Sequence, residues 1–377
     1  MAEPGTVEEI TSEYLSGIAA RLLRGPVEVT GFELVHDPFE FPRFGAKQFY
    51  DIPFTYEGER GPGKSHIILR VMPEMDAVMM LTGDTEHREL KAFKAGLFDQ
   101  VPNTFHVPYL HVIDEPGQYW AFLEDVRPQM EKLGMHVRAP DAVVRSILAH
   151  LAAFHARFWE KREVIDKPWL MSLRRPVDYF YRTIVDILDD MQDPADASLY
   201  ITEQWPWLAE GVLNLVQTLD PATRRIVEKL YRESEHLLAE VEAMPMTLCH
   251  YDFDNRNLGL GDGHTVVIDW EILGRGVSAS DVVRFMVYHN PDNFEALIDH
   301  YLGELEKNLG RPIDRRQWRR GYDLATIAEW QIRGVLFGVM VAAPSAPIPD
   351  EHREAMKERV FGDIGLVEAL AKKCGLA

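Results

Sequence analysis

Residues 249–281, CHYDFDNRNLGLGDGHTVVIDWEILGRGVSASD, contain the pattern that decides the fold. Within them, LGLGDGHTVVI places two short apolar runs on either side of Gly261-Asp262-Gly263, which predicts a β-hairpin. If the turn centres near Gly263, Asn257 and Asp269 lie equally far from it along the chain and face each other. The two side chains would then stand about 5 Å apart at the open end of the hairpin.

An amide oxygen and a carboxylate at that separation can both reach one small hard cation. Mg²⁺ favours such oxygen ligands, so Asn257 and Asp269 are the predicted metal ligands. Asp252 lies on the loop that enters the hairpin, where a carboxylate could orient a substrate hydroxyl and accept its proton. His250 is the second residue placed in the catalytic loop, and its expected role is a hydrogen-bonded strut rather than an acid or base.

The motif H-x-D-x-x-x-x-N, which starts at His250 and is followed by Ile-Asp-Trp at residues 268–270, resembles the aminoglycoside phosphotransferase and choline kinase superfamily. The resemblance implies an α+β, bilobal, protein-kinase-like fold. It also implies Mg²⁺-dependent transfer of the γ-phosphate of ATP to a hydroxyl of a small molecule, with Asp252 as the catalytic base.

Four further residues take expected roles from the same resemblance. Asp281 would brace the catalytic loop, and His155 in LAAFHARFW would be a packed structural histidine. Glu271 would be a surface carboxylate or a contact for metal or substrate. Asp254, an additional acid in the loop, would compete for metal or hydrogen-bond the loop.

The rest of the chain divides into a β-rich part and a helical part. Residues 27–126 contain strand-like runs interrupted by one helical segment at about 84–98, and helical periodicity dominates from about residue 142. We therefore expect an N-terminal lobe at 1–126, in which a leading helix and an antiparallel sheet cover the nucleotide. A helical C-terminal lobe at 127–377 would carry the catalytic loop, metal site and substrate-binding helices, with a cleft between the lobes.

Kinase-like proteins carry a lysine on the third strand that binds phosphates and pairs with a glutamate on the N-lobe helix. Here Arg70 is in register, and Glu89 is its expected partner, with Glu86 as the weaker candidate. Arginine offers bidentate phosphate contacts but is longer and planar, so Lys64 and Lys47 stay open as rivals.

Two more nucleotide contacts follow from the resemblance. PRFGAKQFY would be the nucleotide-covering loop, although it contains a single glycine, Gly45. FLEDVRP resembles the connector between lobes, where backbone groups from Glu124 to Val126 would meet the adenine edge.

Residues 58–65, GERGPGKS, match the phosphate-binding pattern G-x-x-x-x-G-K-[ST]. A true phosphate loop is followed by a helix, whose N-terminal amides hold the phosphate. Here HIILRVMP follows, a β-branched apolar run with no helical spacing. The pattern therefore predicts a glycine-rich connection between two antiparallel strands.

Composition narrows the class of partner and the compartment. Forty basic against sixty acidic residues give a net charge of −20, which argues against nucleic acid and permits a cationic acceptor. Two cysteines suggest no disulfide framework, and the N-terminus lacks the charge pattern of a secretory signal. The apolar stretch GVLFGVMVAAP is too short to span a bilayer, so we expect a cytoplasmic protein without membrane contact.

Other functions stay possible at this point. A catalytically silent nucleotide- or ligand-binding module is favoured by Arg70 and the glycine-poor loop, and a Mg²⁺-dependent hydrolase would leave Asn257 unexplained. A protein kinase is disfavoured because few residues separate Asp269 from Asp281 and no A-P-E follows. The sequence does not indicate the acceptor or the oligomeric state.

Overall fold

The computed structural model of the chain describes residues 3–36, 47–133, 139–176, 181–189, 206–289, 292–346, 353 and 365–376. The chain forms two compact units that are not two continuous halves. The first comprises Met1–Met79, Thr85–Ala139 and Asp254–Glu271, and the second comprises Met80–Asp84, Pro140–Phe253 and Ile272–Ala377. The boundary expected at residues 126 and 127 stays a prediction.

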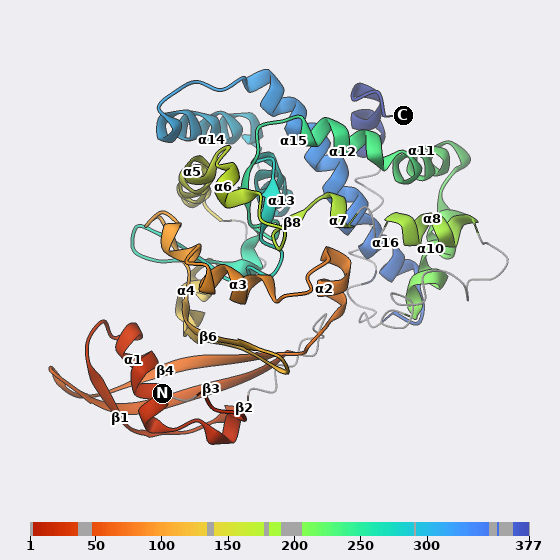
Figure 1. Cartoon of the computed structure of the whole chain (residues 1–377). Coiled ribbons are helices and arrows are strands. Elements are labelled where there is room, and N and C mark those ends of the chain that lie inside the picture. The colour runs from red at the N-terminus through yellow and green to blue at the C-terminus, as the bar shows by residue number, and fades with distance from the viewer. Residues whose placement is uncertain are drawn as a thin grey trace. The chain divides into compact units, whose positions relative to one another are not determined.

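An antiparallel sheet with one covering helix forms the body of the first unit (Figure 1). The strand order is β1-β3-β4-β7-β6, and β2 pairs with β3. Buried side chains of helix α1 (Ser12–Leu22), including Leu15 and Ile18, pack against inward-facing residues such as Ile67 and Leu69. Alternation along the strands places these apolar side chains on one face. The strands are β1 (Val27–Phe32), β2 (Val35–His36), β3 (Gln48–Gly58), β4 (Gly61–Met72), β6 (Tyr109–Glu115) and β7 (Gln118–Glu124).

The GERGPGKS stretch is the tight turn of the β3–β4 hairpin and the first part of β4. Gly58 pairs with Gly61, and Lys64 pairs with Thr55 inside the β3–β4 ladder. Gly61 has a φ of 91°, which a residue with a Cβ rarely adopts. No helix follows Ser65, so the expected strand connection is present and this motif is not a phosphate loop.

The helical segment expected at about 84–98 is shorter than predicted. Its helix is α3 (Arg88–Lys94), preceded by His87 at a φ of 48° and followed by Gly96 at a φ of 65°. A left-handed residue on each side cannot continue an α-helix, which limits α3 to seven residues. A further short helix, α2 (Ala77–Thr82), precedes it, and a 3₁₀ turn (Phe98–Gln100) follows it.

The predicted hairpin forms from β10 (Leu258–Leu260) and β11 (Thr265–Val267), with its register one residue away from the expected one. Leu258 faces Val267, and the amide of Ile268 donates to the carbonyl of Asn257 at 3.0 Å. Asn257 therefore faces residue 268 instead of residue 269. The reason is the turn, because Gly261 and His264 close it and its centre falls between Asp262 and Gly263. Strand β5 (Phe105–His106) pairs in parallel with β11 and ties the hairpin into the first unit.

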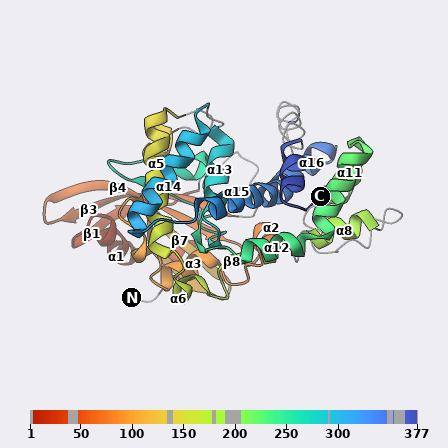
Figure 2. The same cartoon turned by 90° about the horizontal axis from the view of Figure 1, so that it is seen from above.

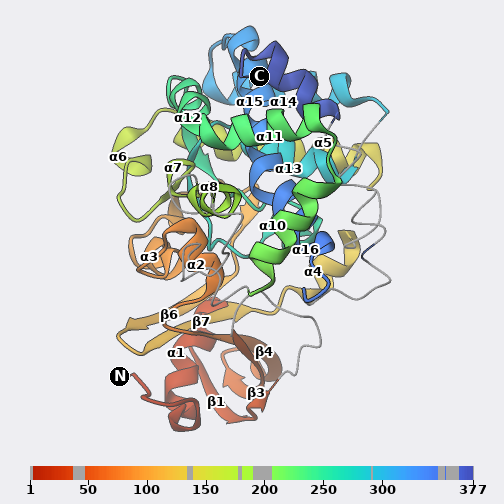
Figure 3. The same ribbon diagram turned by 90° about the vertical axis from the view of Figure 1, so that its right-hand side faces the viewer.

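Helices make up most of the second unit. Helices α5 and α14 pack together, as do α13 and α15 and, at the other end, α10 and α16 (Figure 3). Helix α15 continues through a π-helical turn (Trp330–Gly334) into α16 (Figure 2). A three-stranded sheet in the order β8-β12-β9 lies among these helices. The bounds are α5 (Asp141–Phe158), α10 (Trp207–Thr218), α13 (Ala279–His289), α14 (Phe294–Leu309), α15 (Arg315–Glu329), α16 (Val335–Ala342), β8 (Met171–Ser172), β9 (Thr247–Cys249) and β12 (Gly274–Gly276).

Further elements lie along the chain. Helices α11 (Pro221–Arg232) and α12 (Ser234–Glu242) meet at Glu233. The others are a 3₁₀ turn (Val7–Glu9), α4 (Arg127–Leu133), α6 (Arg162–Ile165), α7 (Arg174–Pro176), α8 (Arg182–Asp189) and a 3₁₀ turn (Asn255–Asn257). Among the described helices none combines the length and apolarity that crossing a bilayer requires. An antiparallel sheet in one unit and helices in the other confirm the predicted α+β class.

Candidate active site

A buried ion pair joins the predicted nucleotide-binding residues of the first unit. Arg70 on β4 pairs with Glu89 on α3, and their side chains are only 5% and 3% exposed. Tyr109 on β6 accepts a hydrogen bond from the Arg70 guanidinium at 2.8 Å and donates one to Glu89. The three side chains form a closed arrangement that fixes helix α3 to the sheet.

Asp269 and Glu271 extend this cluster from the segment that follows β11. The Asp269 carboxylate accepts from the Arg70 guanidinium at 3.3 Å, and Glu271 pairs with Lys47 just before β3. Asp269 has a φ of 61°, a left-handed conformation that aspartate tolerates better than most residues. Such strain in a polar cluster is typical of functional sites.

The Arg88 side chain holds the same segment by contacting the backbone of Glu271. Its guanidinium, on the buried side of α3, donates to the carbonyl oxygen of Glu271 at 2.6 Å. Helix α3 therefore holds the strand partner Arg70 through Glu89, and the Asp269–Glu271 segment through Arg88.

The cluster contains three carboxylates, of Glu89, Asp269 and Glu271, and three cationic side chains. Arg70 and Lys47 pair with these carboxylates, whereas the buried Arg88 donates to the backbone of the same segment. Burial and the neighbouring Asp269 raise the pKa of Glu271 to about 8, although Lys47 acts in the opposite direction. Burial alone would also raise the pKa of Glu89, but Arg70 and Lys47 hold it below its usual value.

The predicted metal ligands have the residue types that bind divalent cations. Asn257, Asp269 and Glu271 offer an amide and two carboxylate groups, the hard oxygen ligands that Mg²⁺ favours. Asn257 is buried at the end of a 3₁₀ turn that leads into β10.

In the second unit, Asp281 holds the catalytic loop through its backbone. The carboxylate of this fully buried residue accepts the amide of His250 at 2.8 Å and the amide of Tyr251 at 2.7 Å. Tyr251 has a φ of 64°, so the loop turns sharply just before Asp252. The Asp281 brace that the sequence predicts is thus formed by two backbone hydrogen bonds.

His155 supports Asp281 from helix α5. Its Nε2 lies 3.1 Å from the Asp281 carboxylate, and its Nδ1 lies 2.8 Å from the hydroxyl of Tyr301. Because a carboxylate can only accept, Nε2 carries the proton and Nδ1 accepts from Tyr301. Cys249 lies close enough to His155 and Asp281 to suggest a metal site, but its thiol donates to the Val277 carbonyl. These hydrogen bonds give the cluster a structural role.

Asp252 receives an arginine partner that the sequence does not reveal. Arg284 on α13 donates to one oxygen of Asp252 from Nε at 3.2 Å and from a terminal nitrogen at 3.0 Å. The other terminal nitrogen of Arg284 donates to Glu329, the last residue of α15, at 3.0 Å. His250 accepts the backbone amide of Asp252 at its Nδ1 at 3.2 Å, consistent with a strut.

The structure also describes all but one of the other candidate residues from the sequence. Glu124 ends β7, its amide donates to the Pro108 carbonyl, and its side chain pairs with His106. The carbonyl of Val126 accepts the first amides of α4. Lys64 is exposed on β4, and Glu86 pairs with Lys91. Gly45 lies outside the described residues, and Asp254 pairs with Arg256 while accepting its amide.

Sequence reasoning missed Tyr109, Arg88, Arg284 and Glu329. The last two lie on helices far along the chain from Asp252, and an arginine on a helix carries no signal of its partner. Arg88 stands next to Glu89 and is also buried, but adjacent residues of a helix point in different directions, so helical spacing gives no signal that both are buried. Tyr109 lies on β6, a strand that the sequence did not single out.

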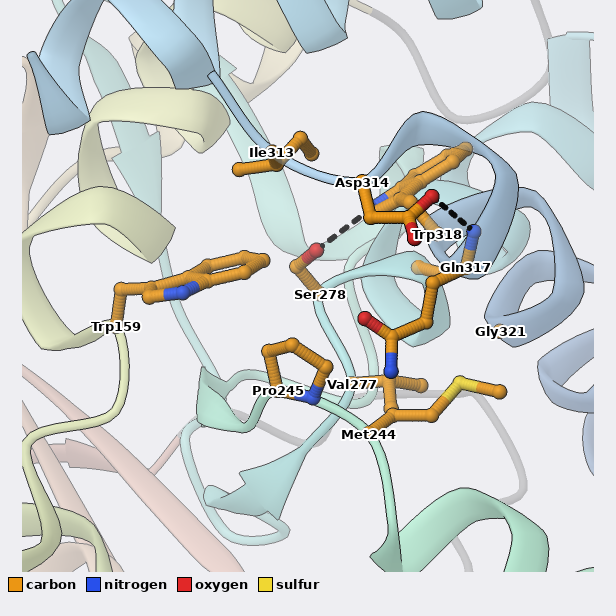
Figure 4. Close-up of a pocket in the computed structure, with 11 residues that line it drawn as sticks. Trp159, Met244, Pro245, Val277, Ser278, Ile313, Asp314, Gln317, Trp318 and Gly321 are labelled. Carbon is orange, nitrogen blue, oxygen red and sulfur yellow. Dashed lines mark hydrogen bonds between the residues drawn. The ribbon is translucent and has the colours of Figure 1, made fainter. Parts of the chain in front are cut away.

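A separate pocket lies in the second unit, with about 330 Å³ of space open to solvent. Figure 4 shows Trp159, Met244 and Pro245 around it, with the Trp318 indole donating to Ser278 at 2.9 Å. Asp314 caps α15 by accepting the amide of Gln317. None of the predicted site residues lines this pocket, so it is not part of the candidate active site.

Comparison with known families and sequences identifies one match. The model described as the phosphotransferase enzyme family matches residues 59–322, more than half of the chain. This range contains every predicted site residue except Gly45 and Lys47, one of the rivals for the phosphate-binding role. A comparison with curated protein sequences gives no significant match.

Solved structures with a similar fold include three kinases. A Plasmodium vivax ethanolamine kinase is 12% identical over 90% of this chain and 83% of that chain, with a TM-score of 0.53. A choline/ethanolamine kinase family protein from Mesorhizobium loti is 13% identical over 92% and 91%, with a TM-score of 0.47. An amicoumacin kinase in complex with AMP-PNP and Ca²⁺ is 13% identical over 94% and 93%, with a TM-score of 0.49. The likeness concerns the fold, and the predicted bilobal, protein-kinase-like class is confirmed.

Proposed function

This chain belongs to the phosphotransferase enzyme family and is a small-molecule phosphotransferase, and we propose that it transfers the γ-phosphate of ATP to a hydroxyl group. In the reaction, the hydroxyl oxygen forms a bond to the γ-phosphorus while the bond to the β,γ-bridging oxygen breaks. The hydroxyl proton passes to a carboxylate, and ADP leaves.

Asp252 is the proposed base. Its amide is held by His250, and the loop before it is held by Asp281, so its carboxylate is presented by a rigid backbone. Arg284 donates twice to one oxygen of Asp252. We propose that the Asp252 carboxylate orients the acceptor hydroxyl and takes its proton.

The nucleotide side is proposed to consist of first-unit residues. The nucleotide is positioned by a cation of this cluster, either Arg70 in its pair with Glu89 or the neighbouring Lys47. Backbone groups from Glu124 to Val126 meet the adenine. Asn257 and Asp269 are the proposed ligands of Mg²⁺, with Glu271 beside them. When bound, the ion would neutralise charge on the transferring phosphate.

The observation that carries the proposal is the family match over residues 59–322, because the range includes Asp252, Asn257 and Asp269 in the order the motif requires. Support also comes from the charged cluster of the first unit, in which Asp269 pairs with Arg70 and the neighbouring Glu271 pairs with Lys47.

The test is ADP release from ATP and Mg²⁺ with a panel of hydroxyl compounds that includes amino sugars, amino alcohols and neutral sugars. Asp252→Asn should lower turnover by roughly 10²- to 10⁴-fold and retain nucleotide binding. Asp262→Asn is the matched control, because Asp262 is an exposed carboxylate in the turn of the same hairpin. Equal turnover in the wild type and Asp252→Asn would refute the proposed base.

The same panel identifies the acceptor class and tests the alternative. The net charge of −20 favours a cationic acceptor slightly over a neutral one, and we expect the enzyme to act in the cytoplasm. Nucleotide-dependent thermal stabilisation without turnover for any hydroxyl compound would instead indicate a silent binding module.

A further inference from the structure

We propose that Lys47, rather than Arg70, contacts the phosphates of the bound nucleotide, and that Glu271 holds Lys47 at the site until nucleotide arrives. This inference rests on the proposed function and gives Arg70 and Lys47 different roles in it. Arg70 would be a positioning residue that holds carboxylates in place, and Lys47 the cation that exchanges partners.

Both terminal nitrogens of Arg70 are held by protein partners, and its Nε is buried without a hydrogen-bond partner among the described residues. One terminal nitrogen contacts Tyr109 and Glu89, and the other contacts Asp269. Transfer of this guanidinium to a phosphate would leave Glu89, which is buried, without its charge partner. Breaking a buried pair in this way is strongly unfavourable.

Lys47 has fewer and more exposed contacts. Its ammonium can donate three hydrogen bonds, and among the described residues it donates one, to Glu271. The side chains of Lys47 and Glu271 are 12% and 18% exposed, compared with 5% and 3% for Arg70 and Glu89. The free energy needed to leave its carboxylate partner is therefore smaller for Lys47 than for Arg70.

The surroundings of Lys47 keep it charged and near the proposed metal ligands. Burial lowers its pKa, but Glu271 and Asp269 outweigh burial and raise the pKa above its ordinary value. A lysine on a flexible stem acts as a point charge for phosphate, whereas arginine requires a planar fork geometry. Glu271, when its lysine moves to the phosphate, would remain as an oxygen donor beside Asp269.

The decisive measurement is the affinity of the full-length protein for ADP without Mg²⁺, compared with its affinity for adenosine, by calorimetry. Lys47→Met should weaken ADP binding by about 10- to 100-fold, the value of a charge-assisted hydrogen bond to phosphate. Adenosine binding should be unchanged because adenosine has no phosphate. Glu271→Gln should strengthen metal-free ADP binding, since it releases Lys47 from its carboxylate partner.

Two further variants separate the roles of the cations. Lys64→Met is the matched control, a lysine exposed on β4 that should leave both affinities unchanged. Lys47→Arg keeps the charge, so it should recover part of the ADP affinity if Lys47→Met loses it. If Lys47→Met binds ADP as tightly as the wild type, the inference is wrong while the proposed function stands. If the wild type binds neither ADP nor adenosine, both are wrong.

Discussion

The two charged regions of this molecule are held in different ways. In the first unit, Arg70, Glu89 and Asp269 are positioned by side-chain ion pairs, with Tyr109 closing the cluster. In the second unit, the loop that presents Asp252 is positioned through its backbone, because the Asp281 carboxylate accepts two consecutive amides. One region therefore depends on matching charge and the other on fixed backbone shape.

This difference follows from what each region is proposed to do. A site for a metal and phosphates has to exchange charged partners, which the more exposed pair of Lys47 and Glu271 can do while the buried pair of Arg70 and Glu89 stays in place. A general base has to keep one position relative to the reacting hydroxyl, and backbone hydrogen bonds to a buried carboxylate give little freedom. Variants that change charge should thus disturb the first region, and variants that change shape should disturb the second.

The largest expected effect is on the buried ion pair of the first unit. Glu89→Gln leaves the Arg70 guanidinium buried with less compensating charge, so the free energy of unfolding should fall by about 3–5 kcal/mol. Denaturant unfolding measures this loss. Glu86→Gln, two residues before the start of α3, is the control, because its pair with Lys91 is largely exposed and should contribute little.

The loss of stability in Glu89→Gln should also depend on pH. Arg70 holds the pKa of Glu89 below its usual value of 4.5, despite the opposing effect of burial. A carboxyl with a depressed folded pKa contributes stability above its unfolded pKa and loses it as pH falls through the folded pKa. The stability difference between the wild type and Glu89→Gln should therefore shrink below about pH 4.5, and a constant difference down to pH 3 would contradict the assigned pair.

The next effect concerns the brace of the catalytic loop. Asp281→Asn replaces one acceptor oxygen with an amide group that cannot accept from His250 or Tyr251, and charge-assisted hydrogen bonds are worth about 1.5–3 kcal/mol each. We expect unfolding at lower denaturant and a fall in kcat with little change in the KM for ATP. Asp166→Asn, at a half-exposed pair with Arg275, is the control. A rise in the KM for ATP with unchanged kcat would contradict a role in the loop.

The sequence predicted those parts of the site that are local in the chain. The hairpin of residues 258–267 has its own turn signal, and the motif around Asp252 is contiguous, so both could be found from spacing. The register was wrong by one residue because two adjacent glycine-containing turns have equal sequence support, and only Gly263 at a φ of 77° chooses between them. The contacts of Lys47 and Arg284 join residues more than thirty positions from their partners, which no local pattern encodes.

A smaller effect should come from close packing against the loop. A Cβ added at Gly276 on β12 would lie 2.1 Å from the hydroxyl oxygen of Tyr251, which donates to the Arg275 carbonyl. Gly276→Ala should cost about 1–3 kcal/mol of stability through overpacking. Gly303→Ala in α14 is the opposite control, because nothing lies within 4 Å of its added Cβ and helix propensity favours alanine. Equal melting temperatures for both variants would show that the loop tolerates displacement at Tyr251.

The smallest effect is expected for Arg284, an ion-pairing side chain that acts on a loop otherwise held by backbone hydrogen bonds. Its guanidinium fixes one oxygen of Asp252 and shares its charge with Glu329, so it acts on the base through side-chain contacts inside the backbone-held region. Arg284→Met should lower kcat by about tenfold, since Asp252 keeps its backbone position but loses the orientation of its carboxylate. Arg284→Lys should recover part of that loss because it restores one charge-assisted hydrogen bond. If Arg284→Met instead loses as much activity as Asp252→Asn, orientation of the carboxylate by charge matters more than the backbone brace, and the contrast between the two regions is reversed.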